Sequence, residues 1–254
     1  MFLSFKFAIL SSTDLFVEGL PMIIFKDVSK NFNSLAALAN ISCDIDTGEF
    51  VFLVGPSGAG KSTLLKLIIR DELPSNGSIF FDDVEINKLS SSQVPHLRRK
   101  VGTIFQDFKL LPQRTIFENV SFPLEILGLD DDEIAKATYE ILELVGLKDK
   151  ASYFPNQLSG GEAQRAATAR AMVMRPEVIL ADEPTGNLDS ASAWEVMQLL
   201  GKLNSLGTTV IMATHNIDIS TSLPHRMLEI RDGRIVKDTK EKKAKGEEVK
   251  KSKK

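Results

Sequence analysis

The stretch "GPSGAGKST" (Gly55 to Thr63) decides how the rest of the sequence is interpreted. It matches the pattern G-x-x-x-x-G-K-[ST] without a gap. The apolar run "FVFLVG" (Phe50 to Gly55) precedes it and predicts a short buried strand. A helical pattern with apolar residues on one face follows from Lys61 to Arg70. The sequence therefore predicts a phosphate-binding loop between a strand and a helix of an α/β fold.

This loop predicts nucleotide binding. Glycines allow the backbone N–H groups to approach phosphate oxygens, and the N-terminus of the following helix presents a positive dipole to the same anion. Lys61 is expected to reach the β- and γ-phosphates, and Ser62 to bind Mg²⁺. The alternative is a glycine-rich turn without a ligand, which the complete motif disfavours. The expected nucleotide contacts are Gly55, Pro56, Ser57, Gly58, Ala59, Gly60, Lys61, Ser62 and Thr63.

A second buried strand, in "VILADEP" (Val178 to Pro184), ends in two adjacent carboxylates. Side chains alternate along a strand, so Asp182 and Glu183 are expected to point in different directions. We assign Asp182 to the metal and Glu183 to the general base that faces the attacking water. A pair of solvated acids is the alternative, and the preceding phosphate-binding loop disfavours it.

The stretch "QLSGGEAQR" (Gln157 to Arg165) resembles a second anion cradle. Ser159 and Glu162 form the S-x-x-E pattern of a helix capping box, which is the structural alternative. Capping does not explain Gly160 and Gly161, because each glycine in the first turn costs up to about 1 kcal/mol relative to alanine. We expect the glycines to leave room for a ligand at exposed N–H groups. This cradle has no lysine or metal ligand of its own.

Composition narrows the class of protein. The chain has 254 residues, 43% hydrophobic and 26% charged, with a single cysteine, Cys43, which excludes a disulfide framework. The net charge of −3 divides into +4 on residues 238–254, with eight lysines against four acidic residues, and −7 on the rest. An acidic body argues against nonspecific nucleic-acid binding. The tail is expected to be disordered and solubilising, with weak contact to anionic lipid as the alternative.

The chain alternates strands and helices in most of its length. Further strands are expected at Ile23 to Val28, Ile41 to Ile45, Glu177 to Leu180 and Thr208 to Ala213, with a helix from about Ala191 to Ser205 and a hairpin turn at Asp232-Gly233. Residues 94–175 are mainly helical, with one strand at Val101 to Phe105, and read as a helical lobe inserted into the α/β core. We place the domain at 22–237, between a flexible extension of 1–21 and the tail of 238–254.

Taken in order, several motifs resemble the ABC-type ATPases from Met22 to about Lys237. "LSGGE" resembles the family's signature, Gln106 in "IFQDF" its Q-loop glutamine, "GNLD" (Gly186 to Asp189) its D-loop, and His215 its switch histidine. Phe32 stands where the family stacks an aromatic ring on adenine, although tyrosine is commoner there. Ala163 stands where glutamine is often found. Each residue alone has a structural explanation, and their common order favours the family.

The resemblance implies a P-loop NTPase (RecA-like) core with an antiparallel β subdomain and an inserted α-helical subdomain. It also implies Mg²⁺-dependent ATP hydrolysis in a head-to-tail homodimer formed with ATP bound. Ser159, Gly160 and Gly161 of one protomer would close over the ATP held by its partner. The implied roles are a base (Glu183), phosphate contacts (Lys61 and His215), γ-phosphate sensing and metal binding (Gln106), metal ligands (Ser62 and Asp182), and nucleotide contacts in the A-loop (Phe32) and D-loop (Asp189).

Residues 94–124 resemble the cell-division branch of the family. That resemblance implies a separate four-span membrane subunit and a peripheral location at the cytoplasmic face of the plasma (inner) membrane. The alternatives are an ATPase of lipoprotein-release or macrolide-export systems and a non-hydrolysing scaffold, which would be expected to lack Glu183 or His215. Phe108, Leu110 and Leu111 could form either the partner's docking groove or simple lobe core.

Overall fold

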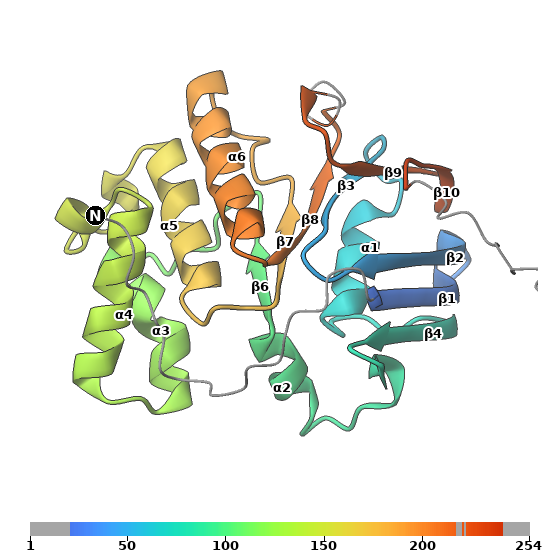
Figure 1. Cartoon of the computed structure of the whole chain (residues 1–254), viewed down its shortest axis with the longest axis horizontal. Helices are drawn as coiled ribbons and strands as arrows, with labels where there is room; N and C mark the ends of the chain where they lie inside the picture. The colour runs from blue at the N-terminus through green and yellow to red at the C-terminus, as the bar shows by residue number, and fades with distance from the viewer. Residues whose placement is uncertain (1–20, 217–219, 221, 241–254) are drawn as a thin grey trace, which may run out of the picture.

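A computed structural model describes residues 21–216, 220 and 222–240, which fold around two β-sheets (Figure 1). The larger sheet has six strands in the order β10-β9-β3-β8-β7-β6. Neighbouring strands from β9 to β6 run parallel, and β10 pairs with β9 antiparallel. The bounds are β3 Phe50–Val54, β6 Val101–Ile104, β7 Val178–Asp182, β8 Thr209–Thr214, β9 Arg226–Arg231 and β10 Arg234–Asp238.

The apolar strands predicted from sequence lie in the middle of this sheet. All residues of β3 and β8 are buried, as expected for parallel strands that are covered on both faces. Their side chains divide between two cores: Val51 and Leu53 pack with α1 and the smaller sheet, whereas Phe52 and Val54 pack on the helical side. Because side chains alternate between the two faces of a strand, β3 contributes residues to both cores.

The smaller sheet is antiparallel, in the order β2-β1-β4-β5, and covers one side of α1. Its strands are β1 Pro21–Phe32, β2 Leu35–Asp46, β4 Asn76–Phe81 and β5 Val84–Glu85. Ile23 pairs with Ile45 and Val28 with Ile41, so the two strands predicted in this region are neighbours, and both are longer than predicted. The antiparallel subdomain implied by the resemblance is therefore present.

The helices flank the larger sheet on both sides (Figure 1). They are α1 Lys61–Ile68, α2 Val94–Arg99, α3 Ile116–Leu127, α4 Asp131–Leu144, α5 Gly160–Met172 and α6 Ser190–Ser205. Helices α3, α4 and α5 form the lobe seen at the left of Figure 1. The predicted segment 94–175 is mainly helical, but its strand β6 pairs with β7 in the core sheet. The helical insertion therefore lies between β6 and β7.

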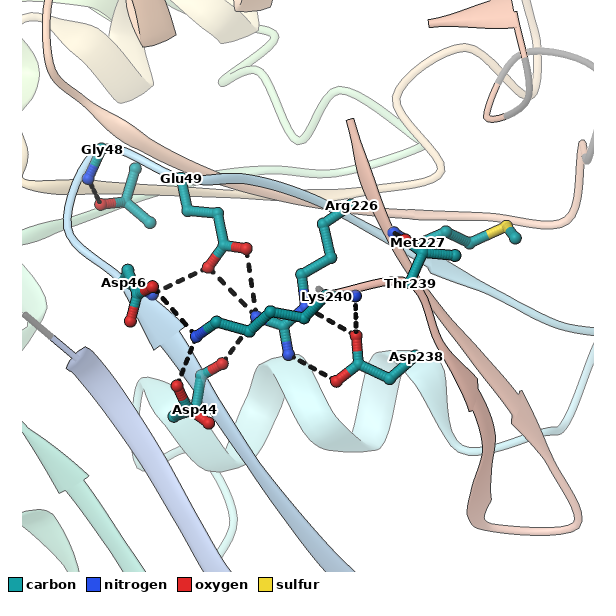
Figure 2. A network of polar contacts seen from close by, with 10 residues as sticks. Asp44, Asp46, Gly48, Glu49, Arg226, Met227, Asp238, Thr239 and Lys240 are labelled. Atoms are coloured by element: carbon teal, nitrogen blue, oxygen red, sulfur yellow. Dashed lines mark hydrogen bonds and ion pairs between the residues drawn. The ribbon is translucent and has the colours of Figure 1, made fainter. Parts of the chain in front are cut away.

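The described structure continues past residue 237, where we placed the end of the domain. Strand β10 extends through Asp238, and Lys240 forms ion pairs with Asp44 and Asp46 (Figure 2). Charged side chains therefore connect residues 238–240, which we assigned to the tail, to β2. Residues 1–20 and 241–254 lie outside the described residues, so the predicted extension and most of the predicted tail remain expectations. Among the described helices, none combines the length and hydropathy needed to cross a bilayer.

Candidate functional site

The phosphate-binding loop connects β3 to α1, as the motif predicted. Gly60 has φ +106°, a left-handed conformation that disfavours any side chain. A Cβ on Gly60 would lie 2.6 Å from the carbonyl oxygen of Ala37, and one on Gly55 would lie 2.1 Å from that of Ile230. These two glycines are therefore required by packing of the loop against β2 and β9, a reason that the sequence did not provide.

Lys61, the charged residue of the loop, is buried, with 5% of its surface exposed. Its Nζ donates hydrogen bonds to the carbonyl oxygens of Gly55 (2.7 Å) and Pro56 (3.0 Å). It also lies 3.6 Å from Oε1 of Glu183. The first-turn N–H groups of α1 have no partner inside the helix, so an ammonium and a helix N-terminus meet at this loop. This combination suits a polyphosphate.

Ser62 and Asp182 meet across the loop, since Ser62 Oγ donates to Asp182 Oδ1 at 3.0 Å. Burial raises the pKa of the Asp182 carboxyl, and the charge of Glu183 adds to this effect, while the Ser62 hydrogen bond and Lys61 oppose it. A nearby cation would favour the ionised form. Two hard oxygen donors beside a phosphate-binding loop fit Mg²⁺, which usually takes one or two protein oxygens and completes its shell with phosphate and water.

No larger metal-binding cluster competes with this pair. Within residues 21–216, 220 and 222–240, no group of three or more His, Cys, Asp or Glu side chains is placed to hold a metal ion.

Glu183 lies one residue beyond the end of β7, with φ +48°. Its backbone N–H donates to the carbonyl oxygen of Ala213 (2.9 Å), which fixes it beside β8. Oε2 lies 2.6 Å from His215 Nδ1, and Oε1 faces Lys61. Asp182 and Glu183 do point to different partners, as expected. Strand alternation is only part of the reason, because the backbone leaves the strand between them.

Gln106 packs against the segment that we identified as the D-loop. Its Nε2 donates to Asn187 Oδ1 (3.3 Å), and Asn187 Nδ2 donates to the Gln106 carbonyl (3.3 Å). A Cβ on Gly186 would lie 3.0 Å from Gln106 Nε2. Asn187 was not among the predicted site residues, although it lies inside the quoted motif "GNLD". The expected role of Gln106 as a metal ligand remains a prediction, since its side chain here is directed to Asn187.

The predicted capping box begins α5. Ser159 Oγ accepts from the Glu162 N–H (3.3 Å), and the Glu162 carboxylate accepts from the Ser159 N–H (3.0 Å). Hydrogen bonds from Lys150 and from the Ser159 backbone lower the pKa of Glu162. The capping alternative is therefore correct for these two residues, and it does not conflict with a role in binding an anion.

The structure explains Gly160 and Gly161 in different ways. Gly160 is exposed, and a Cβ there would make only an ordinary 3.6 Å contact with Leu188. A Cβ on Gly161 would lie 2.5 Å from Ser192 Oγ on α6. Our expectation that both leave room for a ligand therefore does not explain Gly161, which is required by packing between α5 and α6.

The remaining predicted residues occupy the ends of their elements. Asp189 caps α6, with Oδ1 accepting from the N–H groups of Ala191 and Ser192, each at 3.0 Å. These hydrogen bonds lower the pKa of Asp189. Phe32 ends β1 and keeps 40% of its surface exposed, which leaves room for a stacking partner.

One chain thus assembles part of a site. Glu183 contacts both Lys61 and His215, and Ser62 and Asp182 form a separate hydrogen-bonded pair. The signature residues begin α5, which lies across β7 and β8 from α1 (Figure 1). A parallel sheet, a phosphate-binding loop with a strand-end acid pair, and an inserted helical lobe define a P-loop nucleoside triphosphatase.

Comparison with known proteins identifies the family. The sequence profile described as ABC transporter matches residues 38–186, and the chain belongs to this family. It is 51% identical over 218 residues to the cell division ATP-binding protein FtsE of Bacillus subtilis, covering 85% of this chain and 96% of that protein. The protein of the same name from Escherichia coli K12 is 48% identical over 215 residues, covering 84% and 97%.

Solved structures agree with the fold. The dimeric ATP-binding cassette MJ0796 in a post-hydrolysis state, bound to ADP and Pi, has a TM-score of 0.79 and 38% identity, covering 85% of this chain and 97% of that one. The cbiO1 protein of Clostridium perfringens, part of the ABC transporter complex cbiONQ, has a TM-score of 0.80 and 32% identity, covering 86% of this chain and 88% of that one. The predicted ABC ATPase fold is confirmed.

Proposed function

We propose that this chain is the ATP-binding and ATP-hydrolysing subunit of a membrane-associated ABC complex that acts in cell division. The observation that carries hydrolysis is Glu183, whose carboxylate lies between His215 and Lys61 and beside the Ser62–Asp182 pair. The cell-division assignment rests on the FtsE relatives, which favour it over a role in lipoprotein release or macrolide export. A non-hydrolysing scaffold is disfavoured because Glu183 and His215 are both present.

Each residue of the site has its own role in the reaction. Lys61 and the N-terminus of α1 bind the β- and γ-phosphates and offset the charge that develops in the transition state. Glu183 orients a water molecule and accepts its proton, while His215 holds the Glu183 carboxylate and contacts the γ-phosphate. Mg²⁺, held by Ser62, Asp182 and Gln106, would supply further charge neutralisation. Phe32 stacks on adenine.

The second anion cradle completes the site of a partner. Dimeric ABC cassettes among the similar structures support a homodimer for this chain. In a head-to-tail pair, Ser159, Gly160 and Gly161 of one protomer close over the nucleotide held by the P-loop of the other. The exposed position of Ser159 and Gly160 at the start of α5 supports this arrangement.

Mixing two inactive variants tests the shared site. Lys61→Ala disables the P-loop half, and Ser159→Arg the signature half. Each homodimer has two broken sites, whereas a mixed dimer contains one intact site, so ATPase activity should partly return on mixing. Because Ser159 also caps α5, Ser159→Ala is the matched control for loss of the cap, which costs about 1 kcal/mol.

A second measurement covers the case in which both sites must act together. Glu183→Gln with ATP and Mg²⁺ should elute as a dimer in size-exclusion chromatography, and as a monomer without ATP. No rescue on mixing, together with a monomer in both runs even when the membrane subunit is added in detergent, contradicts the shared site.

The membrane subunit is expected to dock in a groove between the core and the helical lobe. The groove has a volume of about 400 Å³ and is lined by Phe105, Leu111, Phe122, Pro123 and Met174 among others. Of the three residues that we considered for this role, Leu111 lines the groove and Leu110 packs on the core. Phe108 is half-buried beside them, and its carbonyl accepts from Arg170 (2.9 Å). A four-span partner in the inner membrane, with this chain bound at its cytoplasmic face, fits the cell-division assignment.

Leu111→Asp tests this surface. The substitution should abolish recruitment of the purified chain to membranes that contain its partner, while basal ATPase activity stays within about twofold of the wild type. Val84→Asp, at an exposed apolar residue of β5, is the control and should leave recruitment unchanged. If basal activity falls together with recruitment, Leu111 belongs to the lobe core and the docking proposal fails.

A further inference from the structure

Lys30 on β1 is a nearly buried lysine outside the reacting cluster. Its side chain is 12% exposed, and its ammonium contacts three groups. It donates to Oε2 of Glu72 at 2.7 Å and to the carbonyl oxygen of Leu73 at 2.9 Å. It also lies over the ring of Phe32, 4.7 Å from the ring centroid, which is a cation–π distance.

These contacts hold the ammonium on one face of the ring. Glu72 and Leu73 follow α1, and their segment is fixed along β1 by two more hydrogen bonds, from Ser75 N–H to Ser29 carbonyl (2.8 Å) and from Asn31 N–H to Ser75 Oγ (3.0 Å). The ammonium therefore cannot move away without losing an ion pair and a hydrogen bond. An aromatic ring has two faces, and Phe32 retains 40% exposure. The face opposite Lys30 is the one available to a base.

We infer that Lys30 is a positioning residue for nucleotide recognition: it fixes the Phe32 ring so that one face is presented to adenine. The inference rests on the proposed role of Phe32. Because Glu72 follows the helix that begins at Lys61, the same chain of contacts also keeps the base platform in register with the phosphate-binding loop. A ring fixed before binding loses less conformational freedom when the base stacks on it.

The test separates recognition of the base from recognition of phosphate. Binding of two probes to the full chain is measured by titration calorimetry with Mg²⁺: the non-hydrolysable analogue AMP-PNP, and inorganic tripolyphosphate, which has no base. Lys30→Met should weaken AMP-PNP binding about two- to fivefold, the range of a cation–π contact, and leave tripolyphosphate binding unchanged. Lys30→Arg keeps the cation and should restore AMP-PNP binding.

The same strand offers a matched control. Lys26 Nζ lies 4.4 Å from the ring centroid of Phe80, so Lys26→Met removes a similar contact elsewhere on β1 and should change neither affinity. Phe32→Ala should weaken AMP-PNP binding alone, and adding Lys30→Met to it should have no further effect.

Several results would overturn the inference, and they are distinguishable. Equal weakening of both probes by Lys30→Met means that Lys30 acts through the loop or the fold. If the losses of AMP-PNP affinity caused by the two single substitutions multiply in the double variant, Lys30 acts independently of Phe32. An unchanged AMP-PNP affinity in Phe32→Ala removes the platform assignment and the inference with it. Failure of the wild type to bind either probe contradicts the proposed function itself.

Discussion

At the residue scale, the chemistry depends on where the backbone leaves β7. Asp182 is the last residue of the strand, and Glu183 follows in a left-handed conformation that is unfavourable for a side-chain-bearing residue. The strain is offset by the Glu183 N–H bond to Ala213 and by contacts of its carboxylate with His215 and Lys61. Strained backbone of this kind is common at functional sites, and here it turns one carboxylate toward the histidine.

We predict that Glu183→Gln binds ATP with near wild-type affinity but loses roughly 10²-fold or more in turnover, the usual cost of removing a general base. The amide keeps the shape of the side chain and loses its basicity. Steady-state ATPase assays and nucleotide titrations measure the two effects separately.

Glu177→Gln provides the control for this substitution. Glu177 precedes the same strand and pairs with Lys100 at the surface, so turnover should not change. Wild-type turnover in Glu183→Gln would show that another group accepts the proton.

At the element scale, α5 and α6 are held together at their first turns. Gly161 approaches Ser192 so closely that no Cβ fits, and Ser192 Oγ in turn donates to the Asp189 cap of α6 at 2.7 Å. Arg165 on α5 also pairs with Glu195 on α6. The signature and the D-loop of one chain are therefore directly connected, which links two parts of the proposed dimer interface.

Gly161→Ala should destabilise the chain by about 1–3 kcal/mol in urea unfolding, because overpacking outweighs the gain in helix propensity. Gly160→Ala is the matched control and should be neutral or slightly stabilising, since its Cβ meets only Leu188 at 3.6 Å.

A second substitution locates the overpacking. Ser192→Gly removes both atoms nearest to the added methyl, so the cost of Gly161→Ala should be smaller in that background. An equal cost in both backgrounds would place the conflict elsewhere.

At the scale of the whole molecule, a charged network joins the two sheets (Figure 2). Arg226 on β9 is 8% exposed and donates to Asp238 (2.7 Å), to Glu49 (3.1 Å) and to the carbonyl oxygen of Asp44 on β2 (2.7 Å). Lys240 connects Asp44 and Asp46 to the same cluster. The edge of the core sheet and the antiparallel sheet are thus fixed to each other near the end of the described chain.

The network predicts a pH dependence of stability. Burial alone would raise the pKa of Asp238, but its hydrogen bonds to Arg226 outweigh this and lower it. A lowered folded-state pKa means that the stabilisation is present above the ordinary Asp value near 3.9 and is lost as pH falls through the lower folded-state value. Asp238→Asn should therefore destabilise the chain at pH 7, by about 1–2 kcal/mol, and progressively less as pH falls below the ordinary Asp value near 3.9.

Urea midpoints at a series of pH values measure this difference. Asp149→Asn, at an exposed carboxylate, should remain close to the wild type throughout. A difference for Asp238→Asn that is constant with pH would mean that side-chain shape, and not charge, accounts for the loss.

The sequence by itself determined the local chemistry. The loop motif, the acid pair at the end of an apolar strand and the S-x-x-E box are each contiguous, so their local structure follows from neighbours along the chain. The buried strands and the long α6 helix were also predictable, because apolar periodicity reports which faces are covered. The same motifs, in order, were sufficient to indicate the ABC family.

Only the tertiary structure decided what depends on residues far apart in the sequence. Gly55 is required by the proximity of Ile230 and Gly161 by that of Ser192. The partner of Gln106 is Asn187, and the partner of Lys30 is Glu72, in the segment that follows α1. Arg226 pairs with side chains from both ends of the domain. Such contacts form when sheets and helices pack against each other. No local sequence pattern specifies them, because their stability depends on the whole packed structure.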